Sequence, residues 1–510
     1  MVRGLRTCLL LCAALPLSAQ DFKDFEKRVT EFTLPNGLQF LVVERHDAPV
    51  LSFHTYVRVG TADDVTGRTG LAYLTERVLF TGTEGIGSRS WPEERKAQDA
   101  IEEIYDRLES ERNLGARGSR SRIDTLETQL RLAIDTARRY GASEAYATAL
   151  DEGGVTRLSH NVSPDETECS YSLPSNRIEF WFLMESQRLL RPSFRGFYAN
   201  RDALVEQRQK GAENMQTRMF NAFSAAAFQA HPYRNPAAGW PGDVAGLRRT
   251  DARAFFDRYY VPGNVVMAIV GDANPAEAKA LAGKYFGPWA AKPVPPLVPT
   301  QEPPQAGPKT VVLESSSAGI ALIGYKRPSQ FEKEDAALDL LQIILAHGKT
   351  GLLYKEMVTD KHLTQRLDIG ATFPAGRYVN TFLFLLAPAQ GHTVDENQQA
   401  LEEFLNRLKT RRLDADIIAR AKDQARVVMV NRLAVNSGLA SLLAVSQGSY
   451  GDWRKLFTTT EDLKKVTAED IQRVLARYFV PAGRTTVYTV LPGQSGTPAA
   501  KPATPSGDKQ

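Results

Sequence analysis

The chain has 510 residues, of which 43% are hydrophobic and 24% are charged, as in an ordinary globular protein. At roughly 100–200 residues per domain, this length predicts two to four domains. The net charge is +4, and the basic residues are scattered rather than gathered among aromatic ones, so the composition argues against a nucleic-acid-binding protein.

The first 19 residues have the pattern of a secretory signal peptide. Arg3 and Arg6 give a basic start, and Leu9 to Leu15 form an apolar segment too short to cross a bilayer about 30 Å thick. Ala19 ends the segment with the small residue typical of a cleavage site. We therefore expect secretion across the inner membrane into the periplasm, and no membrane span in the mature chain.

Strands and helices alternate irregularly after this segment. Residues 37–45 and 50–60 are predicted to form strands joined by a short turn, and residues 71–80 a helix. Apolar residues three and four apart flank the glycine-containing segment 115–121, which predicts a helical hairpin inserted at residues 92–150. This order of elements favours an α+β fold with mostly antiparallel sheets.

Residues 250–271 and 468–493 resemble each other. Each segment reads as an amphipathic helix, then Arg-Tyr-aromatic-Val-Pro, then a strand rich in β-branched residues. We interpret this as an internal duplication, which predicts the following boundaries: a first domain at 30–290, a proline-rich linker at 291–310, a second domain at 311–493 and a disordered tail at 494–510.

The helix predicted at residues 71–80 has the spacing of a zinc site without its ligands. Positions i and i+4 lie on one face of a helix, so two histidines there can bind zinc. A glutamate at i+3 then acts as general base on the bound water, as in the H-x-x-E-H motif. Here the five positions are Tyr73, Leu74, Thr75, Glu76 and Arg77, and only the glutamate is of the required type.

Four segments together carry a resemblance to a known family: LPNGLQFLVVERHDAPV, GRTGLAYLTERVLFTGT, LPSNRIEFWFLMESQRL and AHPYRNPAAGWPGD. Through them, residues 30 to 490 resemble the M16 family of metallopeptidases, which includes insulin-degrading enzyme, pitrilysin and the mitochondrial processing peptidase subunits. It implies two homologous M16-type domains, each a mostly antiparallel sheet packed with helices, joined by the proline-rich linker.

The resemblance assigns the three zinc-ligand positions of the family to Tyr73, Arg77 and Gln207, or to Glu206 in place of Gln207 if the alignment shifts by one residue. A guanidinium has no lone pair for a metal, a phenol with a pKa of about 10 is a rare ligand, and an amide oxygen is weaker than a carboxylate. We therefore expect no bound metal. Glu76 is then either an inactive remnant of the general base or a structural partner of Arg77 or another cation.

The resemblance also implies a cleft for extended peptides. The substrate strand of the family falls on Ser159 and His160, which would pair with peptide backbone. In the second domain Tyr354 keeps one of two substrate-contacting positions, whereas Leu352 replaces the arginine of the other. His160 could also approach Glu76 and form an unrelated metal site.

The expected function is a non-catalytic M16-like subunit that binds extended peptides, needs no cofactor, and pairs with a zinc-bearing M16 homologue or with itself. Two alternatives stay open. The chain could be an active zinc metalloendopeptidase with rearranged ligands, using Glu76 with His160 or Glu206. It could also be a stand-alone peptide-binding scaffold.

Overall fold

The computed structural model describes residues 25–211, 214–316 and 319–493. The predicted signal peptide and the predicted C-terminal tail lie outside these ranges.

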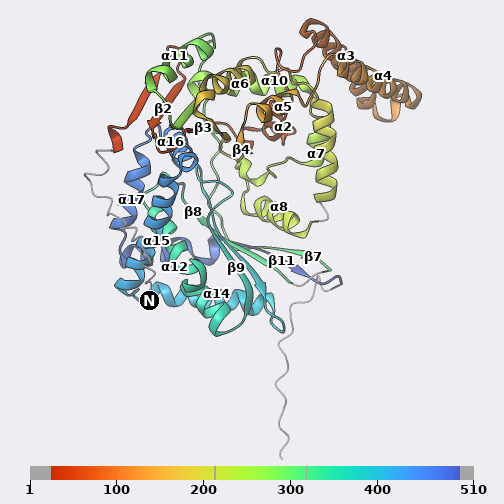
Figure 1. Ribbon diagram of the computed structural model, residues 1–510. Coiled ribbons are helices and arrows are strands. Elements are labelled where there is room, and N and C mark those ends of the chain that lie inside the picture. The colour runs from red at the N-terminus through yellow and green to blue at the C-terminus, as the bar shows by residue number, and fades with distance from the viewer. Residues whose placement is uncertain (1–24, 212–213, 317–318, 494–510) are drawn as a thin grey trace, which may run out of the picture.

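The first half of the described chain forms a six-stranded sheet with the order β1-β2-β6-β3-β5-β4, in which β4 and β1 are the two edges (Figure 1). Neighbouring strands are antiparallel except for the parallel pair β2 and β6. Its strands are β1 (Val29–Thr33), β2 (Gln39–Glu44), β3 (Val50–Val57), β4 (Thr156–Val162), β5 (Thr167–Pro174) and β6 (Val265–Gly271). Its helices are α2 (Leu71–Val78), α3 (Trp91–Asn113), α4 (Arg120–Arg138), α5 (Ala145–Glu152), α6 (Ile178–Leu190), α7 (Phe197–Gly211), α8 (Met215–Ala227), α9 (Pro241–Gly246), α10 (Arg249–Tyr259) and α11 (Pro275–Phe286).

The second half forms a five-stranded sheet with the order β7-β11-β8-β10-β9. Only β7 and β11 are parallel neighbours among its described strands. Its strands are β7 (Lys309–Glu314), β8 (Ala321–Arg327), β9 (Thr364–Phe373), β10 (Asn380–Pro388) and β11 (Arg484–Val490). Its helices are α12 (Asp335–Ala346), α13 (Leu352–Tyr354), α14 (Val394–Thr410), α15 (Ala415–Ala434), α16 (Asn436–Tyr450), α17 (Lys455–Lys465) and α18 (Ala468–Tyr478).

The two sheets share one topology. Strands β2, β6, β3, β5 and β4 correspond in order to β7, β11, β8, β10 and β9, and the single parallel pair falls at the same place in both. The first sheet has β1 in addition. The α+β fold of two related domains with mostly antiparallel sheets, predicted from the sequence, is confirmed.

The repeated sequence segments form the same local structure in each half. Helices α10 and α18 both lead through a short 3₁₀ turn into the central strands β6 and β11. Near each helix start an aspartate accepts a backbone N–H three residues earlier: Asp251 from Arg248 at 3.0 Å, and Asp470 from Thr467 at 2.9 Å. These carboxylates satisfy N–H groups that the helix leaves unpaired.

One helix from each half packs on the sheet of the other half. Helix α8 packs on strands β7, β8 and β11 of the second sheet, and α16 packs on β3, β5 and β6 of the first. Glycines allow both contacts: a Cβ on Gly324 would lie 2.2 Å from the ring of Phe223, and one on Gly448 would lie 2.1 Å from the ring of Tyr56. The two sheets are therefore joined by buried side chains in both directions.

Two segments lie outside these layers. Residues 290–308 run as irregular chain between α11 and β7, and the carboxylate of Glu302 fixes them by accepting the backbone N–H groups of Gln229, Ala230 and His231 at 2.8–3.0 Å. The α3–α4 hairpin projects from the first half (Figure 1). In the described part of the chain, no single helix is long and apolar enough to cross a membrane, and the pair α15–α16, which together satisfies length and composition, is bent by 106°.

Candidate functional site

Helix α2 begins at a position that both glycine and a buried carboxylate define. Gly70 caps the helix with a φ of 88°, which a residue with a side chain adopts only with strain. The two carboxylate oxygens of Asp64 accept the backbone N–H groups of Gly70 at 2.7 Å and Ala72 at 2.8 Å. Burial raises the pKa of Asp64 to about 8, while these N–H donors act in the opposite direction. The first turn of α2 is thus fixed by Gly70 and Asp64, without a contribution from Tyr73, Glu76 or Arg77.

Glu76 is buried on α2 and faces the edge strand β4. Its Oε1 lies 2.8 Å from Nδ1 of His160, and the two side chains are 4% and 39% exposed. The two atoms are close but not aligned as a hydrogen bond, because Glu76 Oε1 has no hydrogen-bond partner among the described residues. The ring of His160 also stacks on Phe80, with centroids 4.6 Å apart. The partner of Glu76 is therefore His160, not Arg77.

Arg77 points to α7 instead. Its Nη1 donates to Oε1 of Gln207 at 3.3 Å, and its guanidinium lies 5.9 Å from the ring centroid of Tyr73. The structure thus brings together the three positions that the sequence assigned to the zinc ligands. Glu206 is not part of this group, since it is exposed and forms an ion pair with Lys210 at 2.6 Å.

These residues do not fit a zinc ion. The guanidinium of Arg77 has no lone pair, carries a permanent positive charge, and already uses the amide oxygen of Gln207 as its acceptor. Tyr73 adds only a phenol. Among the described residues there is no group of three or more His, Cys, Asp or Glu side chains that could hold a metal ion. Glu76 and His160 supply two such side chains, one short of the three protein ligands of a catalytic zinc.

Strand β4 presents its free edge beside α2. Residues 156–161 are exposed on both faces, and the strand is the last of its sheet. Ser159 pairs with Ser170 of β5 and His160 with Cys169, so the opposite backbone edge has no strand partner in the described chain. The register is irregular between Thr156 and Ser159. An extended peptide can pair with such an edge.

A buried charge pair behind Phe80 supports this surface. Arg188 donates from Nε to Glu185 at 3.0 Å, and its guanidinium lies 5.0 Å from the ring centroid of Phe80. Both charged side chains are almost fully buried. Sequence reasoning missed this support, although two opposite charges three residues apart on α6 were a visible signal. Burial also raises the pKa of the Cys169 thiol, so this side chain stays protonated and is a poor metal ligand.

Tyr354 lies apart from these residues, on the second half. It closes the short helix α13, which packs against α12, and its ring is partly buried against the core of that half. Leu352 packs there too. The structure therefore groups α2, α7 and β4, whereas Tyr354 packs against the core of the second half.

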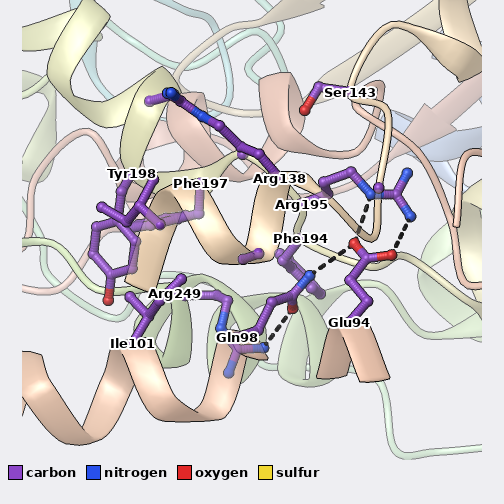
Figure 2. Close-up of a pocket in the computed structure, with 15 residues that line it drawn as sticks. Glu94, Gln98, Ile101, Arg138, Ser143, Phe194, Arg195, Phe197, Tyr198 and Arg249 are labelled. Carbon is purple, nitrogen blue, oxygen red and sulfur yellow. Dashed lines mark hydrogen bonds and ion pairs between the residues drawn. The ribbon is translucent and has the colours of Figure 1, made fainter. Parts of the chain in front are cut away.

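A separate cavity of about 180 Å³ lies where the α3–α4 hairpin meets the first half (Figure 2). Its polar side chains already bind each other: Glu94 accepts from Arg195 at 2.6 and 2.9 Å and from Gln98 at 3.1 Å, and Gln98 accepts from Arg249 at 3.0 Å. The remaining wall is mostly apolar, and none of the residues predicted from the sequence lines it.

Comparisons with known proteins agree on one family. A family profile described as "Peptidase M16 inactive domain" matches residues 246–425. The chain is 24% identical to the zinc protease PqqE of Helicobacter pylori, over 95% of this chain and 97% of that protein.

Solved structures show the same fold. A protease from Helicobacter pylori matches with a TM-score of 0.75 and 20% identity, covering 91% of this chain and 99% of that one. The periplasmic protease PqqL from Escherichia coli matches with a TM-score of 0.64 and 13% identity. That alignment covers 91% of this chain but only 48% of PqqL, so the chain corresponds to about half of that protein.

Proposed function

Because the chain belongs to the M16 peptidase family, we propose that it is a non-catalytic subunit that binds extended peptides and pairs with a zinc-bearing M16 partner. One observation carries the proposal: Arg77 Nη1 lies 3.3 Å from Gln207 Oε1, so a cation and its acceptor stand where the family's ligands would converge. The profile match begins at residue 246 and so includes neither α2 nor α7, and the loss of ligands rests on the side chains of these two helices.

Without an ion, Glu76 has no activated water to deprotonate. Water bound to zinc has a pKa of about 7, whereas bulk water has one of about 16, so a lone carboxylate is a very weak catalyst of peptide hydrolysis. Glu76 instead faces His160 and so helps to hold β4 against α2. This contact supports a binding role for the exposed edge of β4, at which Ser159 and His160 would meet the peptide.

Pairing is supported by length. PqqL is about twice as long as the part of it that this chain matches. A protein with one such unit would reach the same size by binding a second unit, either a zinc-bearing homologue or another copy of itself. The predicted signal peptide would deliver it to the periplasm, the compartment named for PqqL.

Co-expression tests the proposal. The mature chain, tagged and co-expressed with a zinc-bearing M16 homologue, should elute from size-exclusion chromatography as a complex of about twice its own mass. A chain that stays monomeric with the homologue and alone at high concentration would contradict pairing. Retained binding of extended peptides by that monomer, without turnover, would then favour the stand-alone scaffold.

The rearranged-ligand peptidase is kept as a second candidate, because Glu76 and His160 do lie 2.8 Å apart. Elemental analysis of the purified chain separates it from the proposal. One zinc per chain, with peptide hydrolysis abolished by Glu76→Gln and by His160→Gln, would establish the peptidase.

A further inference from the structure

The Arg77 cluster, defined as Tyr73, Arg77 and Gln207, has an uncompensated charge. Arg77 is half-buried, and within residues 25–211, 214–316 and 319–493 no carboxylate oxygen forms an ion pair with it. Its acceptor is the neutral amide of Gln207. The adjacent carboxylate, Glu76, is turned to His160 rather than to Arg77.

Three arginines of the same half bind carboxylates, whereas Arg58 resembles Arg77 in donating to a neutral amide, that of Asn264, at 3.2 Å. Arg188 is paired with Glu185, Arg195 with Glu94 through two hydrogen bonds of 2.6 and 2.9 Å, and Arg249 with Asp99 at 2.9 Å. A guanidinium that is partly removed from water is stabilised by such a carboxylate, which it binds through two parallel N–H groups. Arg77 therefore has capacity for an anion that the described chain does not supply.

The neighbours of Arg77 favour a carboxylate as well. The amide oxygen of Gln207 accepts from Arg77, which leaves its NH₂ group as a donor, and the Tyr73 hydroxyl can also donate. The cluster thus offers donors from three side chains around one positive charge. A planar carboxylate matches the fork of a guanidinium better than it matches an ammonium.

The cluster also lies beside the proposed peptide. Helix α2 contacts both β4 and α7, and in Figure 1 it lies between them. His160 points from β4 to α2, so side chains on the same face of a peptide strand added about 4.8 Å away would also point to α2. Arg77 follows Glu76 on that helix and is directed to Gln207 of α7.

We propose that the Arg77 cluster binds a carboxylate of the peptide that pairs with β4, either its C-terminus or an Asp or Glu side chain. The inference rests on the proposed function, because it concerns the same peptide. It names a ligand class: the position that would hold a cationic metal in a peptidase here recognises an anionic group through a cationic side chain.

The test is peptide binding by the full mature chain, measured by fluorescence anisotropy. The probe is a ten-residue peptide rich in Val and Thr, labelled at its N-terminus, in four forms: a C-terminal acid, a C-terminal amide, the amide with a central Glu, and the amide with a central Gln. The acid or the Glu form should bind about ten- to a hundredfold more tightly than its neutral counterpart. A difference between the acid and the amide would identify the peptide C-terminus as the source of the carboxylate, and a difference between the Glu and Gln forms would identify a side chain.

Three variants assign the effect. Arg77→Met should abolish the preference for the charged peptides, whereas Arg77→Lys should retain part of it because the charge stays and the fork is lost. Gln207→Leu should weaken it. Circular dichroism and the unfolding midpoint confirm that each variant is folded.

The outcomes separate the two proposals. Equal affinity for charged and neutral peptides, or a preference that survives Arg77→Met, overturns the carboxylate site and leaves peptide binding intact. Failure of every peptide to bind the wild-type chain overturns both the carboxylate site and the proposed peptide-binding function.

Discussion

Rebuilding the zinc site is the most direct test of the positions assigned to its ligands. The change is the triple variant Tyr73→His, Arg77→His and Gln207→Glu. In a tetrahedral site with zinc–ligand distances of 2.0–2.1 Å, two ligand atoms lie about 3.4 Å apart. Arg77 Nη1 and Gln207 Oε1 are 3.3 Å apart, so side chains from these two positions already converge at a suitable spacing.

The effect is a gain of zinc-dependent stability. At a free zinc concentration a thousandfold above the dissociation constant, binding to the folded state alone stabilises it by about 4 kcal/mol. The wild-type chain should gain nothing, since a guanidinium repels the ion. The assay compares thermal unfolding with zinc and with a chelator, and calorimetry gives the stoichiometry, expected to be one ion per chain.

The matched control is the double variant Tyr73→His and Arg77→His, which keeps Gln207. It should bind zinc more weakly than the triple variant, because the third ligand is then an amide oxygen rather than a carboxylate. Equal zinc affinity of the two variants would indicate that a side chain other than residue 207 is the third ligand, and Glu206 would be tested first. No zinc-dependent stabilisation of the folded triple variant would refute the assigned positions, and tight zinc binding by the wild type would refute the reasoning about Arg77.

Three further predictions concern the scaffold. Arg195→Met should lower the free energy of unfolding by about 3–5 kcal/mol in urea titrations, since it leaves a buried carboxylate unpaired; a loss below about 1 kcal/mol would contradict this. Burial lowers the pKa of His54 to about 4 and raises that of Glu168 to about 7. The unfolded chain therefore takes up the His54 proton first, so His54 alone lowers the free energy of unfolding by up to about 3 kcal/mol from pH 6.5 to 4, an effect that Glu168 opposes in the wild type and that His54→Leu removes. The raised pKa of Glu168 acts oppositely, because its contribution to stability is present below about pH 4.5 and is lost as the pH rises to 7. Glu168→Gln should remove that loss. Stability that depends on pH in the same way in the wild type and in both variants would refute the two assigned directions. Phe223→Ala should cost about 3–5 kcal/mol, whereas the exposed Arg218→Ala should be nearly neutral; equal effects would argue against the packing of α8 on the second sheet.

The sequence predicted the elements of the site better than their contacts. The spacing from Tyr73 to Arg77 placed them on one helical face because that periodicity is local. Gln207, 130 residues later, was reached only through the family resemblance. The partner of Glu76 was left open between Arg77 and another cation, and the structure selects His160, because strand β4 adds to the sheet beside α2. Such pairing depends on strand register, which a single sequence does not specify.

For the fold, too, the sequence predicted the elements better than the contacts between them. The repeated helix–Pro–strand segments predicted two related domains, and the two sheets do share one topology. The exchange of α8 and α16 between the halves was not predicted, because an amphipathic helix reveals that it has an apolar face but not which sheet will cover it. Phe223 and Gly324 are a complementary pair only once both halves are folded.

The edges of the first sheet differ in a way that bears on function. At β1, which is only partly exposed, Glu31 accepts from the Trp453 indole at 3.1 Å, and Phe25 packs on Trp453 and Phe457, so second-half side chains contact that end of the sheet. Residues 156–161 of β4 are all exposed. An uncovered edge strand invites pairing with other chains, and proteins normally protect one. Under the proposed function, the exposed edge of β4, which lies beside helix α2, is the edge with which the extended peptide pairs.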